Sequence, residues 1–95
     1  MTADGAIQKT VEIVNRAGMH ARPAAELVKL AGSFESDIRL EKDGLEVNGK
    51  SIMGVLMLAA ERGSQLKISA IGRDAEDAVT ALTDLVGRGF GELEA

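Results

Sequence analysis

His20, Arg22 and Pro23 are the residues of this chain whose types and spacing best suit chemistry. An imidazole nitrogen can act as a nucleophile, and a guanidinium offers a permanent positive charge with forked donors to an anion. Pro23 fits only the first turn of a helix, so a helix is expected to begin close to Ala21. A helix N-terminus has free N–H groups and a partial positive charge, which favour a phosphate. The segment predicts a phosphoryl-accepting His20, with the Ala21 and Arg22 N–H groups and the Arg22 side chain holding the phosphate oxygens.

The alternative for His20 is a surface histidine without a chemical role, because a neutral imidazole is tolerated in many environments. Its neighbours favour the chemical interpretation. Gly18 allows the loop to turn tightly and keeps bulk away from the ring, while Arg22 adds a fixed cation with forked donors.

The segment from Gly44 to Ser51 matches the P-loop pattern G-x-x-x-x-G-K-[ST]. A P-loop needs a tight loop of exposed N–H groups, whereas the intervening Leu-Glu-Val-Asn alternates like a half-buried strand. A chain of 95 residues also leaves little room for a doubly wound nucleotide-binding fold. We therefore expect a strand here. Tight, magnesium-dependent ATP binding would instead indicate a nucleotide-binding protein.

Ser51 is expected to cap a helix, and it also suits a regulatory phosphorylation site. A phosphate there would meet helix N–H groups, while its added charge would repel an acidic partner. The helix that follows is rich in Met and Leu, and no single face can bury all of them. Met53 and Leu56 are expected to form an exposed partner patch, and the alternative is that they belong to the core.

Composition narrows the classes of protein. The chain has 45% hydrophobic and 27% charged residues, which predicts one globular domain over residues 1–95, with loose termini at 1–6 and 89–95. A net charge of −4 argues against nucleic-acid binding. The absence of cysteine excludes disulfides, thiolate zinc sites and cysteine nucleophiles, and it fits a cytoplasmic location. No apolar run approaches the roughly 18 residues of a membrane span, and no metal or cofactor is expected.

The pattern of apolar residues predicts the element order β-α-β-β-α-β-α and an α+β fold. Strands are expected over 7–14, 37–41, 45–47 and 65–70, because apolar and polar residues alternate there. Helices are expected over 21–31, from 52 until Gly63 ends the helix, and over 75–86 with Asp74 as its cap. Strands that show one face to water favour an antiparallel sheet with all helices on its other face.

Two segments resemble the HPr family, the histidine-containing phosphocarriers of the bacterial phosphoenolpyruvate:sugar phosphotransferase system. Asn15-x-x-Gly-Met-His-Ala-Arg-Pro-Ala-Ala25 is similar to the active-site signature, and Val47–Val55 is similar to the regulatory serine segment. The resemblance covers about 7–86. It implies an open-faced β-sandwich with a four-stranded antiparallel sheet and three helices on one face, which agrees with the expected elements. Met19 departs mildly from the pattern, where Leu or Ile is more usual.

The resemblance also implies a phosphoryl relay by a carrier rather than by a stand-alone enzyme. Enzyme I would phosphorylate His20 at Nδ1 with help from Arg22, and His20 would pass the group to IIA components. An HPr kinase/phosphorylase would act on Ser51. The alternative is a nitrogen-related or purely regulatory HPr paralogue that is not linked to sugar transport, although the pairing of His20 with Arg22 argues against a purely regulatory role. A monomer is expected, and the partner-binding surface would comprise Met19, Ile52, Met53 and Leu56.

Overall fold

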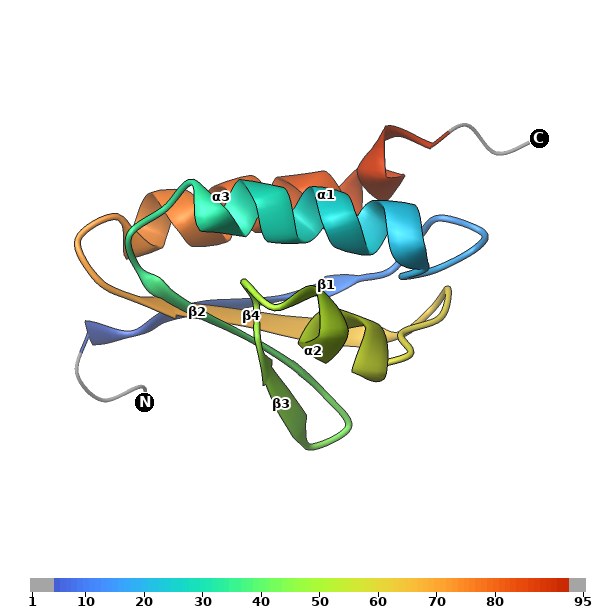
Figure 1. Ribbon diagram of the computed structural model, residues 1–95, viewed down its shortest axis with the longest axis horizontal. Coiled ribbons are helices and arrows are strands. Elements are labelled where there is room, and N and C mark those ends of the chain that lie inside the picture. Colours follow the sequence, from blue (N-terminus) through green and yellow to red (C-terminus); the bar gives the residue numbers. More distant parts are fainter. Residues whose placement is uncertain (1–4, 93–95) are drawn as a thin grey trace.

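The structure is a computed structural model that describes residues 5–92 of the chain. It confirms the predicted α+β fold, in which three helices cover one face of a four-stranded antiparallel sheet (Figure 1). The elements, in chain order, are β1 (Ile7–Glu12), α1 (Ala21–Gly32), β2 (Asp37–Lys42), β3 (Leu45–Asn48), α2 (Ile52–Met57), β4 (Gln65–Ile71), α3 (Ala75–Gly87) and the 3-10 turn η2 (Gly89–Gly91).

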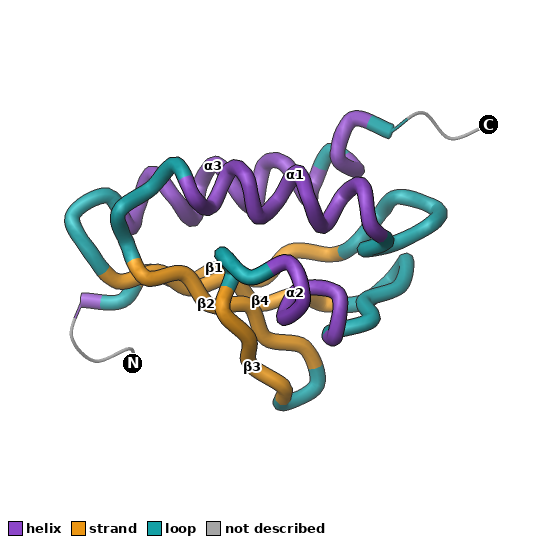
Figure 2. The backbone as a smooth tube through the Cα atoms, in the orientation of Figure 1, coloured by secondary structure: helices purple, strands orange, loops and turns teal. Residues whose placement is uncertain are grey.

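The strands are arranged in the order β1-β4-β2-β3, and all neighbours are antiparallel. Strands β2 and β3 form a tight hairpin, whereas β1 pairs with β4, the last strand in the sequence, with Val11 opposite Leu66. Figure 2 shows β3 extending away from α1 and α3. The segment that matched the P-loop pattern is therefore strand β3 followed by a turn, so its backbone is not a phosphate-binding loop.

The hydrophobic core lies between the sheet and the inner faces of α1 and α3, which lie side by side over it (Figure 1). Leu27 of α1, Ile68 of β4 and Leu82 of α3 are fully buried, as helical and strand periodicity require. The opposite face of the sheet is polar, with Lys67 and Glu41 paired at 3.1 Å on neighbouring strands. Within residues 5–92, none of the helices is long and apolar enough to cross a membrane.

The second helix is shorter than expected. It ends at Met57, and Gly63 instead lies in the turn before β4, where its N–H donates to the Ile13 carbonyl at 2.7 Å. The early end of α2 lets the chain turn back towards the loop before α1, where the Ala60 carbonyl accepts the Met19 N–H at 2.8 Å. Strand β1 likewise ends at Glu12 rather than at residue 14.

Asp74 precedes α3 as predicted, but its side chain makes no cap bond to that helix. Its carboxylate instead accepts the N–H groups of Glu35 and Ser36, at 2.9 and 3.0 Å, and the Ser36 hydroxyl. The Ser36 hydroxyl and then the Glu35 N–H lower the pKa of Asp74 below its ordinary value of 3.8. Asp74 therefore ties the chain before β2 to the start of α3.

The substitution Asp74→Asn is expected to destabilise the protein at neutral pH and to matter less in acid. A folded-state pKa below the unfolded value gives stability that is fully present above about pH 4 and is lost as pH falls through the folded pKa. Urea unfolding of both proteins between pH 2 and 7 measures this difference. Asp43→Asn, at a hairpin side chain that is 85% exposed, is the control. A stability gap that stays constant down to the lowest pH would contradict the prediction.

Candidate functional site

The loop between β1 and α1 is held from inside by Asn15. This residue is buried, and its amide Nδ2 donates to the Gly18 carbonyl at 2.8 Å, while the Gly18 N–H donates to the Asn15 carbonyl at 3.1 Å. The Met19 N–H donates to the carbonyl of Ala60, which anchors the loop to the segment after α2. The loop is therefore a fixed platform for the residue that follows Met19 (Figure 1).

His20 occupies the N-cap position of α1 in an extended conformation, and its side chain makes no cap bond. The side chain is 43% exposed, so its ring is open to solvent. The first helical bond runs from the Ala24 N–H to the His20 carbonyl at 3.0 Å, and Pro23 has no N–H. Among residues 5–92, the Ala21 and Arg22 N–H groups thus have no acceptor and remain available to an anion at this helix end.

The carboxylate of Glu92 contacts three side chains of this site. Oε1 accepts the Asn15 amide N–H at 3.0 Å, while Oε2 lies 3.0 Å from His20 Nε2 and 3.4 Å from a guanidinium nitrogen of Arg22. The Glu92 side chain is 13% exposed, compared with 70% for Arg22. The Asn15 donor first, and the contacts with His20 and Arg22 after it, lower the pKa of Glu92 below its ordinary value, so it is ionised at neutral pH.

A family model described as "PTS HPr component phosphorylation site" matches residues 7–88 of this chain. The chain belongs to the HPr family. The phosphocarrier protein HPr of Cupriavidus necator is 43% identical over 88 residues, which are 93% of this chain and 99% of that protein. The crystal structure of HPr-C-His from Thermoanaerobacter tengcongensis is 48% identical with a TM-score of 0.89, over 93% of this chain and 99% of that one. The HPr dimer from the same organism is 50% identical with a TM-score of 0.74, over 86% and 94%.

These comparisons confirm the resemblance that was based on the two sequence segments. They show that the protein is an HPr-type phosphocarrier of the phosphotransferase system. Two of the predicted site residues, His20 and Arg22, lie together at the start of α1, joined through Glu92. The expectation of a monomer stays a prediction, since one solved HPr relative is a dimer.

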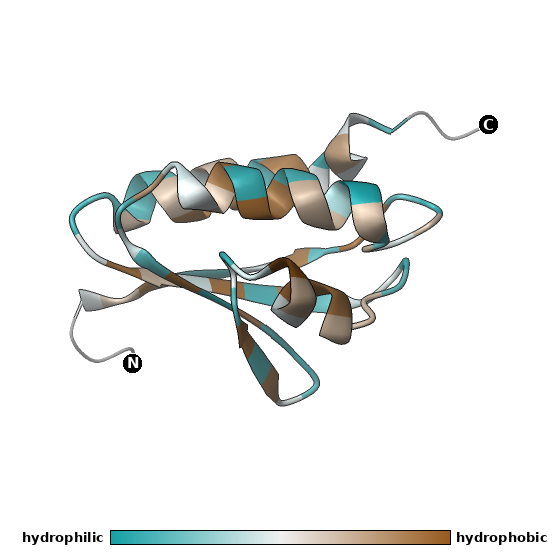
Figure 3. Ribbon diagram, in the orientation of Figure 1, coloured by the Kyte–Doolittle hydropathy of each residue, from teal (hydrophilic) through white to brown (hydrophobic). Residues whose placement is uncertain are grey.

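Ser51 precedes α2, and the predicted partner surface comprises three exposed residues of α2 and the buried Met19 of the loop before α1. The Ser51 hydroxyl accepts the Gly54 N–H at 3.1 Å, which confirms that it caps α2. Ile52, Met53 and Leu56 are exposed on this short hydrophobic helix (Figure 3). Met19 is 5% exposed and packs in the core, because the loop that carries it is bonded to Ala60. Its side chain therefore offers little surface to a partner, and the expectation that Met19 belongs to the partner surface stays a prediction.

Two residues of the site were not predicted. Asn15 stands in the HPr signature, but its role as the buried support of the loop depends on Glu92 and Gly18 coming into contact with it. Glu92 fell in the terminus expected to be loose, but it follows the η2 turn, in which Gly89 and Phe90 are buried. The available signal in the sequence was Phe90, an aromatic residue close to the C-terminus, with the acidic Glu92 two residues after it. Residues 1–4 and 93–95 of the expected loose termini lie outside the described residues.

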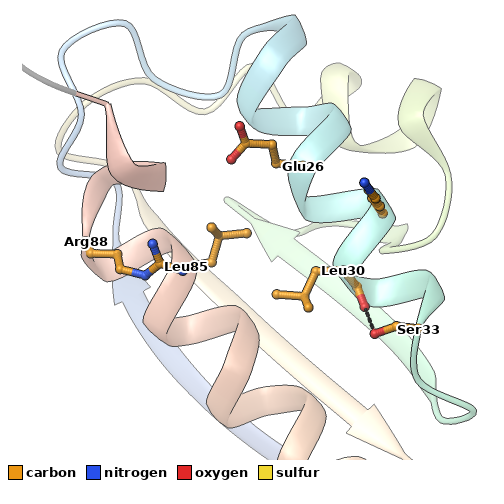
Figure 4. A pocket seen from close by; sticks show the side chains of 6 residues that line it. Glu26, Leu30, Ser33, Leu85 and Arg88 are labelled. Atoms are coloured by element: carbon orange, nitrogen blue, oxygen red, sulfur yellow. Dashed lines mark hydrogen bonds between the residues drawn. The ribbon is translucent and has the colours of Figure 1, made fainter.

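A separate groove lies between α1 and the end of α3 (Figure 4). Leu30 and Leu85 supply its apolar lining, and Glu26, Lys29 and Arg88 its charged rim. No residue of the His20 site lines this groove, so it takes no part in that site's chemistry. In the part of the chain that the structure describes, no cluster of His, Asp or Glu side chains could hold a metal ion.

Proposed function

We propose that this HPr-family protein is a phosphoryl relay that accepts a phosphoryl group from phospho-enzyme I on His20 Nδ1 and passes it to IIA components. The observation that supports this best is the position of the His20 ring. It stands at an exposed helix N-terminus, next to free backbone N–H groups and to the Arg22 guanidinium. These are the donors that a phosphate on this ring would need.

The proposed transfer places few demands on the carrier. The bond from phosphorus to the donor protein breaks as the bond to Nδ1 forms, and the onward step reverses these roles with a IIA acceptor. A carrier that bound its phosphorylated state too strongly would slow the onward step. A small set of donors, with Arg22 70% exposed and able to turn, suits temporary holding of the group. The exposed ring also leaves room for a docking protein.

Incubation with enzyme I and phosphoenolpyruvate tests the relay directly. Intact-protein mass spectrometry is expected to show the addition of one phosphoryl group, and peptide mapping is expected to place it on His20. The label is expected to be lost in acid, as the bond between nitrogen and phosphorus requires, and to move to a IIA protein on mixing. A protein that stays unlabelled with active enzyme I would contradict the proposal.

We further propose that docking proteins contact the exposed surface formed by Ile52, Met53 and Leu56 on α2. Such apolar, adaptable side chains are typical of protein contact sites. A transport-linked carrier in the cytoplasm is the proposed setting, because the acceptor histidine and its arginine are both present. The nitrogen-related or purely regulatory paralogue stays the alternative, and the pairing of His20 with Arg22 argues against a purely regulatory role.

Ser51 is proposed as a site for an HPr kinase/phosphorylase, and its negative-charge mimic Ser51→Asp is expected to slow phosphorylation by enzyme I several-fold. Asp is as good an N-cap as Ser, so the bond to Gly54 is replaced and the fold is kept. The added charge lies beside the proposed docking surface, where it would repel an acidic partner. Initial rates of phosphorylation measure the effect. Ser51→Asn, a neutral cap of the same shape, is the control, and equal rates for both variants would remove the regulatory proposal.

A further inference from the structure

The proposed relay assigns no role to the carboxylate of Glu92, yet this group is bonded to the reactive ring. Its Oε2 atom lies 3.0 Å from His20 Nε2, and its Oε1 atom accepts the Asn15 amide N–H at 3.0 Å. The Glu92 side chain is 13% exposed although the His20 side chain is 43% exposed. The Glu92 carboxylate therefore lies between the His20 ring and the buried side chain of Asn15.

A packed turn delivers Glu92 to this position. After α3, the residues Gly89, Phe90 and Gly91 all have positive φ, at 66, 60 and 72°, and they turn the chain towards the start of α1 (Figure 1). Glycine adopts this conformation without strain, and burial of the Phe90 ring offsets the strain at the middle position. The Glu92 N–H donates to the Gly89 carbonyl at 3.0 Å. Contact with His20 thus follows from a folded element.

A carboxylate next to an imidazole decides which ring nitrogen carries the hydrogen. An ionised carboxylate can only accept hydrogen bonds. Glutamate is ionised at neutral pH, and the Asn15 donor lowers the pKa of Glu92 further below its ordinary value. Nε2 of His20 must then be the donor in their 3.0 Å contact. Because a neutral imidazole carries hydrogen on one nitrogen, Nδ1 retains a free lone pair.

We propose that Glu92 is a positioning residue that holds His20 in the Nε2–H tautomer and so presents Nδ1 as the nucleophile. This inference rests on the proposed relay, because it describes how the same ring is prepared. Nδ1 donates its lone pair to phosphorus, the ring gains positive charge, and the carboxylate at Nε2 balances that charge. The hydrogen on Nε2 need not leave for the transfer to proceed.

The isosteric substitution Glu92→Gln reverses the polarity of this contact. The Asn15 amide is buried and donates, so the oxygen of the new amide must face Asn15. Its NH₂ group then takes the place of Oε2 and donates to His20 Nε2, which drives the ring hydrogen to Nδ1. Arg22 is 70% exposed and can turn into solvent, away from the NH₂ group. The variant therefore blocks the nucleophile while it keeps the shape of the site.

Nitrogen-15 NMR of the neutral His20 ring reads the tautomer directly. Nδ1 is expected to give the chemical shift of an unprotonated nitrogen in the wild-type protein, and Nε2 is expected to do so in Glu92→Gln. The initial rate of phosphorylation by enzyme I is expected to fall roughly tenfold in Glu92→Gln. One hydrogen bond favours the unreactive tautomer by about this factor. It should fall less in Glu92→Ala, which selects neither tautomer. Glu46→Gln, an equal charge change at an exposed strand residue, should match the wild type.

This order of rates separates positioning from a structural role, because truncation to Ala removes more contacts than replacement by Gln. An unchanged tautomer in Glu92→Gln would overturn the inference, as would a Gln variant that is phosphorylated at the wild-type rate. The NMR measurement needs no enzyme I. A wild-type protein that is never phosphorylated on His20 would therefore overturn the proposed relay, while the tautomer would still decide the role of Glu92.

Discussion

Replacement of His20 by alanine is expected to abolish phosphorylation by enzyme I and to leave the protein folded. The imidazole supplies the only proposed nucleophile, and the remaining donors of the site can hold a phosphate but cannot form the bond. Stability is expected to stay within about 1 kcal/mol, because the side chain is 43% exposed and makes no cap bond to α1. Mass spectrometry after incubation with enzyme I and phosphoenolpyruvate measures the label.

Arg22→Ala is the matched variant for this experiment. It removes one exposed donor from the same helix turn, keeps the nucleophile, and is expected to slow labelling without abolishing it. Circular dichroism of both variants checks that the fold is kept. If the His20→Ala protein were still phosphorylated to the wild-type extent, the nucleophile would have to be another residue and the assignment would be wrong.

The substitution Gly18→Ala is expected to lower the free energy of unfolding by about 2 to 5 kcal/mol. Gly18 has a φ of +70°, a conformation that costs a residue with a Cβ roughly 1 to 2 kcal/mol. A Cβ at this position would also lie 2.6 Å from the Ala60 carbonyl oxygen, which cannot retreat freely because it accepts the Met19 N–H. Overpacking of this kind adds about 1 to 3 kcal/mol. Urea unfolding measures the difference.

Gly63→Ala separates the two contributions. Gly63 has a φ of +92°, but a Cβ there would have open space around it, so the substitution is expected to cost only about 1 to 2 kcal/mol. Gly18→Ala should also slow phosphorylation, because relief of the clash moves the loop that carries His20. Equal destabilisation by both substitutions would show that the close approach to Ala60 has no energetic weight.

The parts of the molecule that were predictable from the sequence have local causes. Alternation around Ile68 identifies a strand, and the apolar stripe that includes Leu82 identifies a helix. Pro23 marks the start of α1 because proline is tolerated only in a first turn, which in turn places His20 at the helix N-terminus. The cap formed by Ser51 is another short-range effect, since its hydroxyl bonds three residues along the chain.

The parts that were missed depend on contacts between distant segments. Asp74 is of a residue type that commonly caps helices, but its carboxylate accepts a hydrogen bond from Ser36 instead. No local sequence pattern predicts this contact. Met19 stands next to His20 in the sequence, but its N–H donates to the Ala60 carbonyl and its side chain packs in the core. Glu92 reaches His20 only because the η2 turn reverses the chain after α3. Propensity and periodicity describe residues that are close in sequence, so they do not predict contacts between distant segments.

The pairing of β1 with β4 has a consequence for biosynthesis. As the polypeptide leaves the ribosome, α1 and the β2–β3 hairpin can form from neighbouring residues, but β1 has no partner until Gln65–Ile71 has been made. The loop that carries His20 cannot form its hydrogen bond to Ala60 until that residue has been made. The His20 ring likewise cannot contact Glu92 until the end of the chain has been made. A nascent chain therefore contains His20 for most of its translation without the contacts that surround this side chain in the folded protein.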